Sequence, residues 1–200
     1  MIVVINYGVG NLHSVRKAVE YVGGDVVVTG DAETIMRAEK VILPGVGAFQ
    51  DGMVGLQSRG LTQILLDAVK QGKLLLGICL GMQLLFSESE EQGAHQGLDL
   101  ISGKVVLFDQ PGIKVPQIGW NQVAASKPSA LLHGIQEGDY VYFNHSYYCI
   151  PEEDGVALTR TDYGSSFVSA VEKNNIYGVQ FHPEKSQRVG LKILKNFVEL

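Results

Sequence analysis

LLLGICLGMQLLF, residues 74–86, decides the fold of this chain. The stretch begins as a short apolar run and passes through Gly77, Cys79 and Gly81 into a second apolar run with helical spacing. A strand that turns sharply into a helix between two small residues is typical of the G-x-nucleophile-x-G elbow, which lifts the central side chain clear of a sheet. We therefore expect an α/β fold with Cys79 at the carboxyl edge of a parallel sheet.

Apolar runs of similar length precede this stretch and extend its pattern. Four runs followed by glycine or turn residues predict buried parallel strands: residues 2–5, 25–28, 40–43 and 73–78. Between them, residues 12–22 and 61–71 carry apolar side chains at helical spacing and stop at glycines. Strands that alternate with helices in this way predict a doubly wound sheet, mostly parallel and flanked by helices.

The second half of the chain has a different pattern and is expected to be strand-rich. After about residue 100, shorter runs alternate apolar and polar side chains, and Asn174 and Asn175 predict a hairpin turn. From Ser186, an expected N-cap, apolar residues at helical spacing predict a closing helix. No linker, repeat or low-complexity tract is visible, so we expect one domain over residues 1–200.

Composition and charge exclude several classes of protein. The net charge is −5 and the basic residues are dispersed, so nucleic acid is not an expected partner. The N-terminus lacks a basic leader and no apolar run is long enough for a membrane span, which indicates a cytoplasmic protein without membrane contact. The two cysteines, Cys79 and Cys149, have neither CxxC spacing nor the density of a disulfide framework.

Cys79 is the candidate nucleophile. Its flanking glycines let a strained turn close, and the helix that follows puts free N–H groups and its positive end beside the sulfur. That environment favours the thiolate, which is the reactive form. An arbitrary cysteine between a strand and a helix is more often a small core residue. The glycines on both sides favour the catalytic interpretation here.

GVQFHPEKS, residues 178–186, supplies a candidate proton carrier. His182 ends an apolar strand, and Pro183 keeps it out of the helical region. Side chains two residues apart on an extended chain point to the same side, so Glu184 is expected to orient the His182 ring. Alone, His-Pro-Glu would more often simply begin a helix. Beside the elbow, it predicts a Cys-His-Glu triad.

PGVGAF, residues 44–49, follows a predicted strand and should open at the same sheet edge as Cys79. Its glycines leave backbone amides accessible. An amide near Val46 or Gly47, together with the N–H of Leu80, is a candidate oxyanion hole. As a bare glycine turn, the segment would be equally well explained by structure alone.

Together these motifs resemble the class I, or triad, glutamine amidotransferases, nearly end to end from Ile2 to about Phe197. The resemblance implies a flavodoxin-like fold and hydrolysis of glutamine through a γ-glutamyl thioester, without a cofactor. It also implies that four residues hold the substrate: Gln83, His145, Ser146 and Tyr147.

Three further stretches, at 6–15, 119–121 and 142–148, read NYGVGNLHSV, GWN and YFNHSYY. They are similar to the glutaminase subunits of imidazole glycerol phosphate synthases, from histidine biosynthesis. That resemblance implies a heterodimer with a (βα)8-barrel cyclase, which uses the ammonia to convert the ribonucleotide PRFAR into imidazole glycerol phosphate and AICAR.

If the triad and its sheet take up all 200 residues, none are left to bind the molecule that accepts the ammonia. We therefore expect the acceptor site on another chain. Free ammonia would mostly protonate in neutral water, so a sealed interface is expected. The candidate interface residues are Pro116, Gln117, Ile118, Gly119, Trp120 and Lys185. A lone tryptophan also fits ordinary core or surface packing.

Two alternatives remain open at this point. One is a glutaminase subunit of another synthase, of the anthranilate or aminodeoxychorismate type, although the GWN triplet argues against it. The other is a non-catalytic nucleotide-binding or regulatory module, because residues 7–13 begin like a dinucleotide fingerprint. There His13 replaces the third glycine and no acidic residue clearly ends a second strand.

Other polar residues carry weaker signals. The histidines His13, His95, His133 and His145 show no metal-ligand spacing, so no metal is expected. The acidic run SESEEQG, residues 87–93, is expected to be a solvated loop. The Met, Leu and Phe residues that follow Cys79 are expected on a helix that faces the core.

Overall fold

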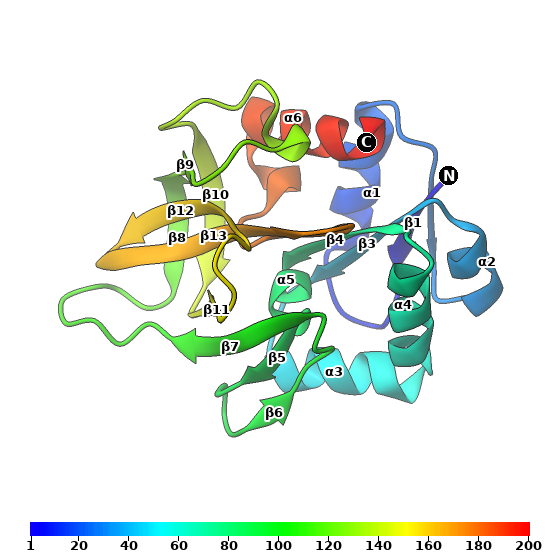
Figure 1. The fold of residues 1–200 in the computed structure, drawn as a ribbon, viewed down its shortest axis with the longest axis horizontal. Helices are drawn as coiled ribbons and strands as arrows, with labels where there is room; N and C mark the ends of the chain where they lie inside the picture. The colour runs from blue at the N-terminus through cyan, green and yellow to red at the C-terminus, as the bar shows by residue number, and fades with distance from the viewer.

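The computed structural model describes all residues 1–200 and contains a long twisted sheet with helices on both faces (Figure 1). Half of this sheet is parallel, in the order β2 (Val26–Thr29), β1 (Ile2–Ile5), β3 (Lys40–Gly45), β4 (Leu74–Cys79) and β14 (Ile176–Val179). The four strands predicted in the first half are all present; β1 has the predicted bounds, and the ends of the other three differ by at most two residues. The α/β prediction is confirmed.

The other half of the sheet is mainly antiparallel and comes from the second half of the chain. Its strands continue the order as β13 (Ser165–Lys173), β11 (Tyr147–Pro151), β7 (Ile101–Leu107), β5 (Phe86–Ser89) and β6 (His95–Gln96). Two more strands branch from this order, because β12 (Ala157–Tyr163) pairs with β13 and β9 (Ala124–Ala125) pairs with β12. A separate antiparallel ribbon pairs β8 (Gln117–Gln122) with β10 (Tyr140–His145). Asn174, with φ +54°, lies in the hairpin turn between β13 and β14, as expected.

Helices pack on opposite faces of the parallel half (Figure 1). One face carries α1 (Leu12–Tyr21) and α6 (Gln187–Glu199); the other carries α2 (Ala32–Arg37), α3 (Phe49–Ser58) and α4 (Leu61–Lys70). Two apolar cores result, because successive strand side chains point to opposite faces. Val3 and Ile5 enter the core with α3 and α4, whereas Ile2 and Val4 enter the core with α1 and α6.

Two local expectations need correction. The elbow helix α5 spans only Leu80–Leu84, so Phe86 begins β5 instead of extending the helix, although it is buried as expected. Ser186 stands at the N-cap of α6, but its side chain makes no capping bond. None of the helices is both long and apolar enough to cross a membrane.

Strand register brings three chain segments together at the carboxyl edge of the parallel half. Gly45 of β3 pairs with Cys79 of β4. On the other side of β4, Val179 pairs with Ile78, so Gln180 follows directly beside Cys79. The segments that follow β3, β4 and β14 therefore meet at one edge, where open α/β sheets bind ligands.

Candidate active site

Cys79 occupies a strained turn between β4 and α5. Its backbone, at φ +54° and ψ −110°, lies outside the regions that side chains with a Cβ normally adopt. The flanking glycines are required because their surroundings are full. A Cβ on Gly77 would lie 2.7 Å from the Gly81 carbonyl oxygen, and one on Gly81 would lie 1.8 Å from the Leu43 carbonyl oxygen. The turn thus fits the nucleophile elbow that its sequence predicts.

His182 and Glu184 form a buried pair beside this turn. The imidazole Nδ1 lies 2.9 Å from Glu184 Oε1, while His182 Nε2 is buried without a hydrogen-bond partner. The expected hydrogen bond is present, but it does not arise from an extended chain alone, because a turn also contributes. His182 is extended, whereas Pro183–Lys185 forms a short 3-10 turn, η2, which carries Glu184 back toward the ring.

The electrostatic surroundings of His182 favour its protonated form. Burial lowers the pKa of His182, but contact with the Cys79 sulfur in its thiolate form and then with the Glu184 carboxylate outweighs burial and raises that pKa well above its usual range. His182 Nδ1 is committed to Glu184. Nε2 is therefore the nitrogen that is free to exchange a proton with the sulfur or with a substrate.

Ser186 fixes the backbone on which His182 stands. Its Oγ donates to the His182 carbonyl oxygen at 2.6 Å and accepts from the Tyr142 N–H at 2.9 Å. The His182 N–H in turn donates to the Tyr142 carbonyl oxygen at 2.9 Å. His182 is thus tied to β10 through both of its backbone polar groups, which explains why Ser186 is not available as a cap.

A cavity of about 220 Å³ opens at Cys79. Its walls include every residue expected to hold the substrate or the oxyanion: Val46, Gly47, Leu80, Gln83, His145, Ser146 and Tyr147. Three more residues line it without having been expected there, namely Glu91, Pro116 and Asn144. The sequence expectation and the geometry agree on where these side chains gather, and their roles remain a proposal.

Glu91 is the acidic residue at this cavity, and it departs from the expectation of a solvated loop over residues 87–93. Residues 86–89 form β5, which runs parallel to β7 and leads the chain back toward the cavity. The Glu91 carboxylate accepts the backbone N–H of Phe49 at 2.8 Å. The sequence of this acidic run does not indicate which of its carboxylates reaches the cavity, because that depends on the pairing of β5 with β7.

His145 presents a neutral ring to the cavity. Burial lowers the pKa of His145 to about 4, although its Nδ1 contacts the Tyr147 carbonyl oxygen at 2.7 Å. Since a carbonyl only accepts, Nδ1 carries the proton of the neutral ring and Nε2 keeps a free lone pair. Nε2 is buried and has no partner within the chain.

The expected interface residues divide between two environments. Ile118 and Trp120 are 61% and 46% exposed on β8, with Trp120 edge-on to the Tyr142 ring at 6.0 Å. Lys185 lies over the other strand of this ribbon, with its Nζ 5.8 Å from the centroid of the Tyr142 ring. Gln117 departs from the expectation because alternate residues of a strand point to opposite faces, and its side chain is buried.

Pro116 and Gly119 complete the expected interface set. Pro116 lines the Cys79 cavity, and Gly119 of β8 is partly exposed between Ile118 and Trp120. Two more apolar side chains are exposed in this part of the chain: Val46, which lines the cavity, and Val115, which precedes Pro116.

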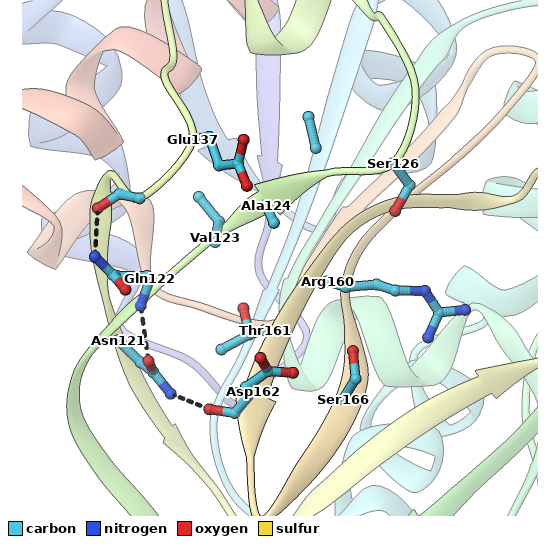
Figure 2. Close-up of a pocket in the computed structure, with 12 residues that line it drawn as sticks. Asn121, Gln122, Val123, Ala124, Ser126, Glu137, Arg160, Thr161, Asp162 and Ser166 are labelled. Atoms are coloured by element: carbon cyan, nitrogen blue, oxygen red, sulfur yellow. Dashed lines mark hydrogen bonds between the residues drawn. The ribbon is translucent and has the colours of Figure 1, made fainter.

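A larger cavity of about 530 Å³ lies between β8, β9 and β12 (Figure 2). Asn121 crosses it, donating to the Asp162 carbonyl oxygen at 2.9 Å and accepting from the Gln122 N–H at 2.8 Å. The lining carries charges of both signs, Glu137, Arg160 and Asp162, but no cysteine or histidine. Asn121 of the GWN triplet therefore joins β8 to β12, whereas Cys79 and His145 line the smaller cavity. No group of three or more His, Cys, Asp or Glu side chains is arranged to hold a metal ion.

The fold and this geometry agree with comparisons to known proteins. The family model described as glutamine amidotransferase class-I matches residues 3–200. The chain belongs to the class-I glutamine amidotransferase family. Among family members, the imidazole glycerol phosphate synthase subunit HisH of Aquifex aeolicus is 52% identical over 196 residues, 98% of this chain and 94% of that protein. The HisH of Syntrophotalea carbinolica is 50% identical over 208 residues and covers both chains completely.

Two solved structures share the fold at lower identity. A putative GMP synthase protein of Thermoplasma acidophilum has a TM-score of 0.75 at 21% identity, over 99% of this chain and 92% of that chain. The PurLQS structure from Thermotoga maritima has a TM-score of 0.75 at 19% identity, over 99% and 97%. At these identities the likeness shows the fold, whereas the HisH relatives also fix the branch of the amidotransferase family.

Proposed function

We propose that this chain is the glutaminase subunit of an imidazole glycerol phosphate synthase, which hydrolyses glutamine and passes ammonia to a cyclase subunit. The observation that carries the proposal is that Cys79, on a strained elbow at the cavity wall, contacts His182, which is paired with the buried Glu184 carboxylate. Identity of about 50% to HisH subunits along the whole chain supports the assignment to this synthase.

Cys79 is the nucleophile of the proposed reaction. Its sulfur attacks the side-chain carbonyl carbon of glutamine, and the carbonyl π electrons move to the oxygen. Backbone amides of Leu80 and of the segment at Val46 and Gly47 stabilise that oxyanion. Collapse of the intermediate breaks the C–N bond and leaves a γ-glutamyl thioester on the sulfur.

His182 moves the protons in both halves of the reaction. In the first half, protonated Nε2 gives its proton to the departing nitrogen, so that ammonia leaves. In the second half, neutral Nε2 takes a proton from water, which attacks the thioester and releases glutamate. Glu184 holds the ring with Nε2 toward the sulfur and stabilises the charged imidazolium.

The remaining cavity residues suit the two ends of glutamine. The Gln83 Nε2 protons are used within the chain, on the Tyr147 carbonyl oxygen and on Gln180, so Gln83 offers its oxygen to the substrate amide. The Glu91 carboxylate suits the α-ammonium group by charge. The His145-Ser146-Tyr147 segment completes the wall that contacts the substrate.

The proposed partner is a (βα)8-barrel cyclase, which would convert PRFAR and ammonia into imidazole glycerol phosphate and AICAR. The exposed apolar residues Ile118 and Trp120, with Lys185 nearby, support a docking face beside the cavity. Docking there would let ammonia leave the site without entering bulk water, where it mostly protonates.

Glutamate release from glutamine tests both parts of this function. The purified chain and its Cys79→Ala variant are assayed with and without the cyclase and PRFAR. We expect release to rise sharply with the loaded cyclase and to vanish in Cys79→Ala. If the wild type stays inactive with that cyclase, the partner assignment is wrong, and labelling of Cys79 by a reactive glutamine analogue then decides whether the glutaminase assignment is wrong as well.

A further inference from the structure

Gln180 is a buried amide in contact with the sulfur of Cys79. It follows β14 directly and stands beside Cys79 because Val179 and Ile78 are paired in the parallel register. The Gln180 side-chain Nε2 lies 3.8 Å from Cys79 Sγ, within the range of an N–H···S hydrogen bond. Gln180 has no solvent-exposed surface, so bulk water does not compete for this contact.

The orientation of this amide follows from its other neighbours. Gln83 Nε2 donates to the Tyr147 carbonyl oxygen at 3.1 Å, an atom that can only accept. A second proton on the same nitrogen points to Gln180 Oε1 at 3.2 Å. Since that oxygen accepts, the nitrogen of the Gln180 amide must be the end that faces the sulfur.

We propose that Gln180 stabilises the Cys79 thiolate by donating this N–H, and thereby holds the nucleophile ready for attack. The proposal rests on the proposed function, in which Cys79 is the nucleophile. The opposite contact is the Asn144 carbonyl oxygen, 3.9 Å from the sulfur, which can accept only from the protonated thiol. Gln180 and Asn144 therefore favour opposite protonation states, and removing Gln180 leaves the thiol form with the advantage.

Other titratable groups also act on this sulfur and must be constant in any test. His182 contacts it and is itself paired with Glu184, and Tyr7 and Cys149 are near enough for their ionisation to be disfavoured by a thiolate. His145 and Glu91 line the same cavity. A substitution at Gln180 leaves all six groups in place.

The pH dependence of Cys79 alkylation by iodoacetamide tests the proposal, since only the thiolate reacts. Gln180→Glu replaces the donor by an acceptor of the same shape, and Gln180→Met removes the donor while filling the space. Hydrogen bonds to charged groups imply a rise of about one pH unit in the alkylation midpoint for Gln180→Met, and a larger rise for Gln180→Glu. Below both midpoints, one unit is a tenfold slower alkylation.

Asn196→Asp is the matched control. Asn196 is also a buried amide and donates to the carbonyl oxygens of Leu131 and His133, but it lies on α6 and does not line the Cys79 cavity. We expect its midpoint to equal that of the wild type. An unchanged midpoint in Gln180→Met, with native circular dichroism, overturns the proposal.

Two further readings keep the test decisive. In the unaltered chain, the side-chain ¹⁵N resonance of Gln180 should shift in the same pH step as Cys79 alkylation, and a resonance that stays fixed overturns the proposal even when a variant does not fold. If the midpoints shift as expected, but the wild type releases no glutamate and a reactive glutamine analogue does not label Cys79, the glutaminase function is wrong while the contact between Gln180 and the thiolate stands.

Discussion

His182 Nδ1 and Glu184 Oε1 lie 2.9 Å apart, in side chains that are 2% and 1% exposed. Because the carboxylate occupies one ring nitrogen, the other is left for proton exchange beside Cys79. The pair is also isolated from water. Removing one member of a buried ion pair is costly, because the remaining charge is then buried without a partner. Glu184 contacts the His182 ring but does not line the cavity, so a substitution at Glu184 should change kcat separately from KM.

Glu184→Gln should lower kcat for glutamate release by about a hundredfold or more, because the imidazolium loses the charge that stabilises it. The KM for glutamine should change little, since Glu184 does not line the cavity. Steady-state kinetics in the presence of the loaded cyclase measure both. Glu199→Gln, which removes an exposed carboxylate paired with Lys195, is the control and should leave kcat unchanged. Equal kcat values for wild type and Glu184→Gln would remove Glu184 from the triad.

Gly81→Ala should destabilise the fold by about 3 kcal/mol or more, because overpacking against a rigid backbone cannot be relieved by side-chain rotation. The added Cβ would lie 1.8 Å from the Leu43 carbonyl oxygen. Gly47→Ala is the matched comparison, since its Cβ meets nothing within 4 Å and only its φ of +107° opposes the substitution. That strain is expected to cost about 1–3 kcal/mol. Urea unfolding of both variants checks the ranking, which equal losses would contradict.

The stability of the chain should fall in acid partly because of His145. The pKa of His145 is lowered by burial from 6.5 to about 4, so the unfolded chain binds a proton that the folded chain refuses between these values. The contribution of His145 is thus complete above pH 6.5 and is lost as the pH falls toward 4. The loss should be about 3 kcal/mol at that pH.

His145→Gln isolates this effect, because glutamine can donate to the Tyr147 carbonyl oxygen but does not titrate. Urea unfolding of the wild type and of this variant at neutral and at acid pH gives the comparison, in which all other titrating groups cancel. The wild type should lose more stability than the variant between the two conditions. Parallel losses would mean that His145 is protonated in the folded chain.

Ile118→Ala and Trp120→Ala should weaken binding to the cyclase by about tenfold or more, as truncation of a central apolar contact commonly does. Both side chains are exposed on β8, so the isolated chain should stay as stable as the wild type. Ile150→Ala is the matched control, because Ile150 is also an exposed isoleucine but lies on β11. Titration calorimetry with the cyclase measures the affinities. If all three variants bind equally, the docking face lies elsewhere.

Much of the fold follows from short-range pattern, and the helix α3 marks where this reasoning stops. The sequence FQDGMVGLQS, residues 49–58, contains two glycines that disfavour a helix, and no element was expected there. Their purpose is visible only in the packed structure. A Cβ on Gly55 would lie 2.7 Å from the Tyr7 carbonyl oxygen, and one on Gly52 would lie 3.0 Å from Leu84. These positions require glycine because α3 packs closely against Tyr7 and Leu84, and the local sequence does not indicate this close packing.

The candidate site divides in the same way. Cys79, His182 and the oxyanion segment were accessible from the sequence because each follows a strand with a distinctive turn, and strand ends share an edge. Glu91 and the contact between Gln180 and the sulfur were not, since one depends on where β5 pairs and the other on the rotation of an amide. Turns can be predicted from neighbouring residues in the sequence, whereas contacts between distant side chains depend on tertiary packing.

The register of β14 against β4 has a consequence for errors in folding. Phe181 is packed in the core with α1 and α6, while its neighbours Gln180 and His182 face Cys79. A register shift of one residue would exchange the two faces of the strand. The Phe181 ring would then face the Cys79 sulfur, and Gln180 and His182 would enter the apolar core. Such a chain would be both unstable and inactive. The register that buries Phe181 therefore also turns Gln180 and His182 toward Cys79, so that one side chain secures both the packing of this strand and the geometry of the candidate site.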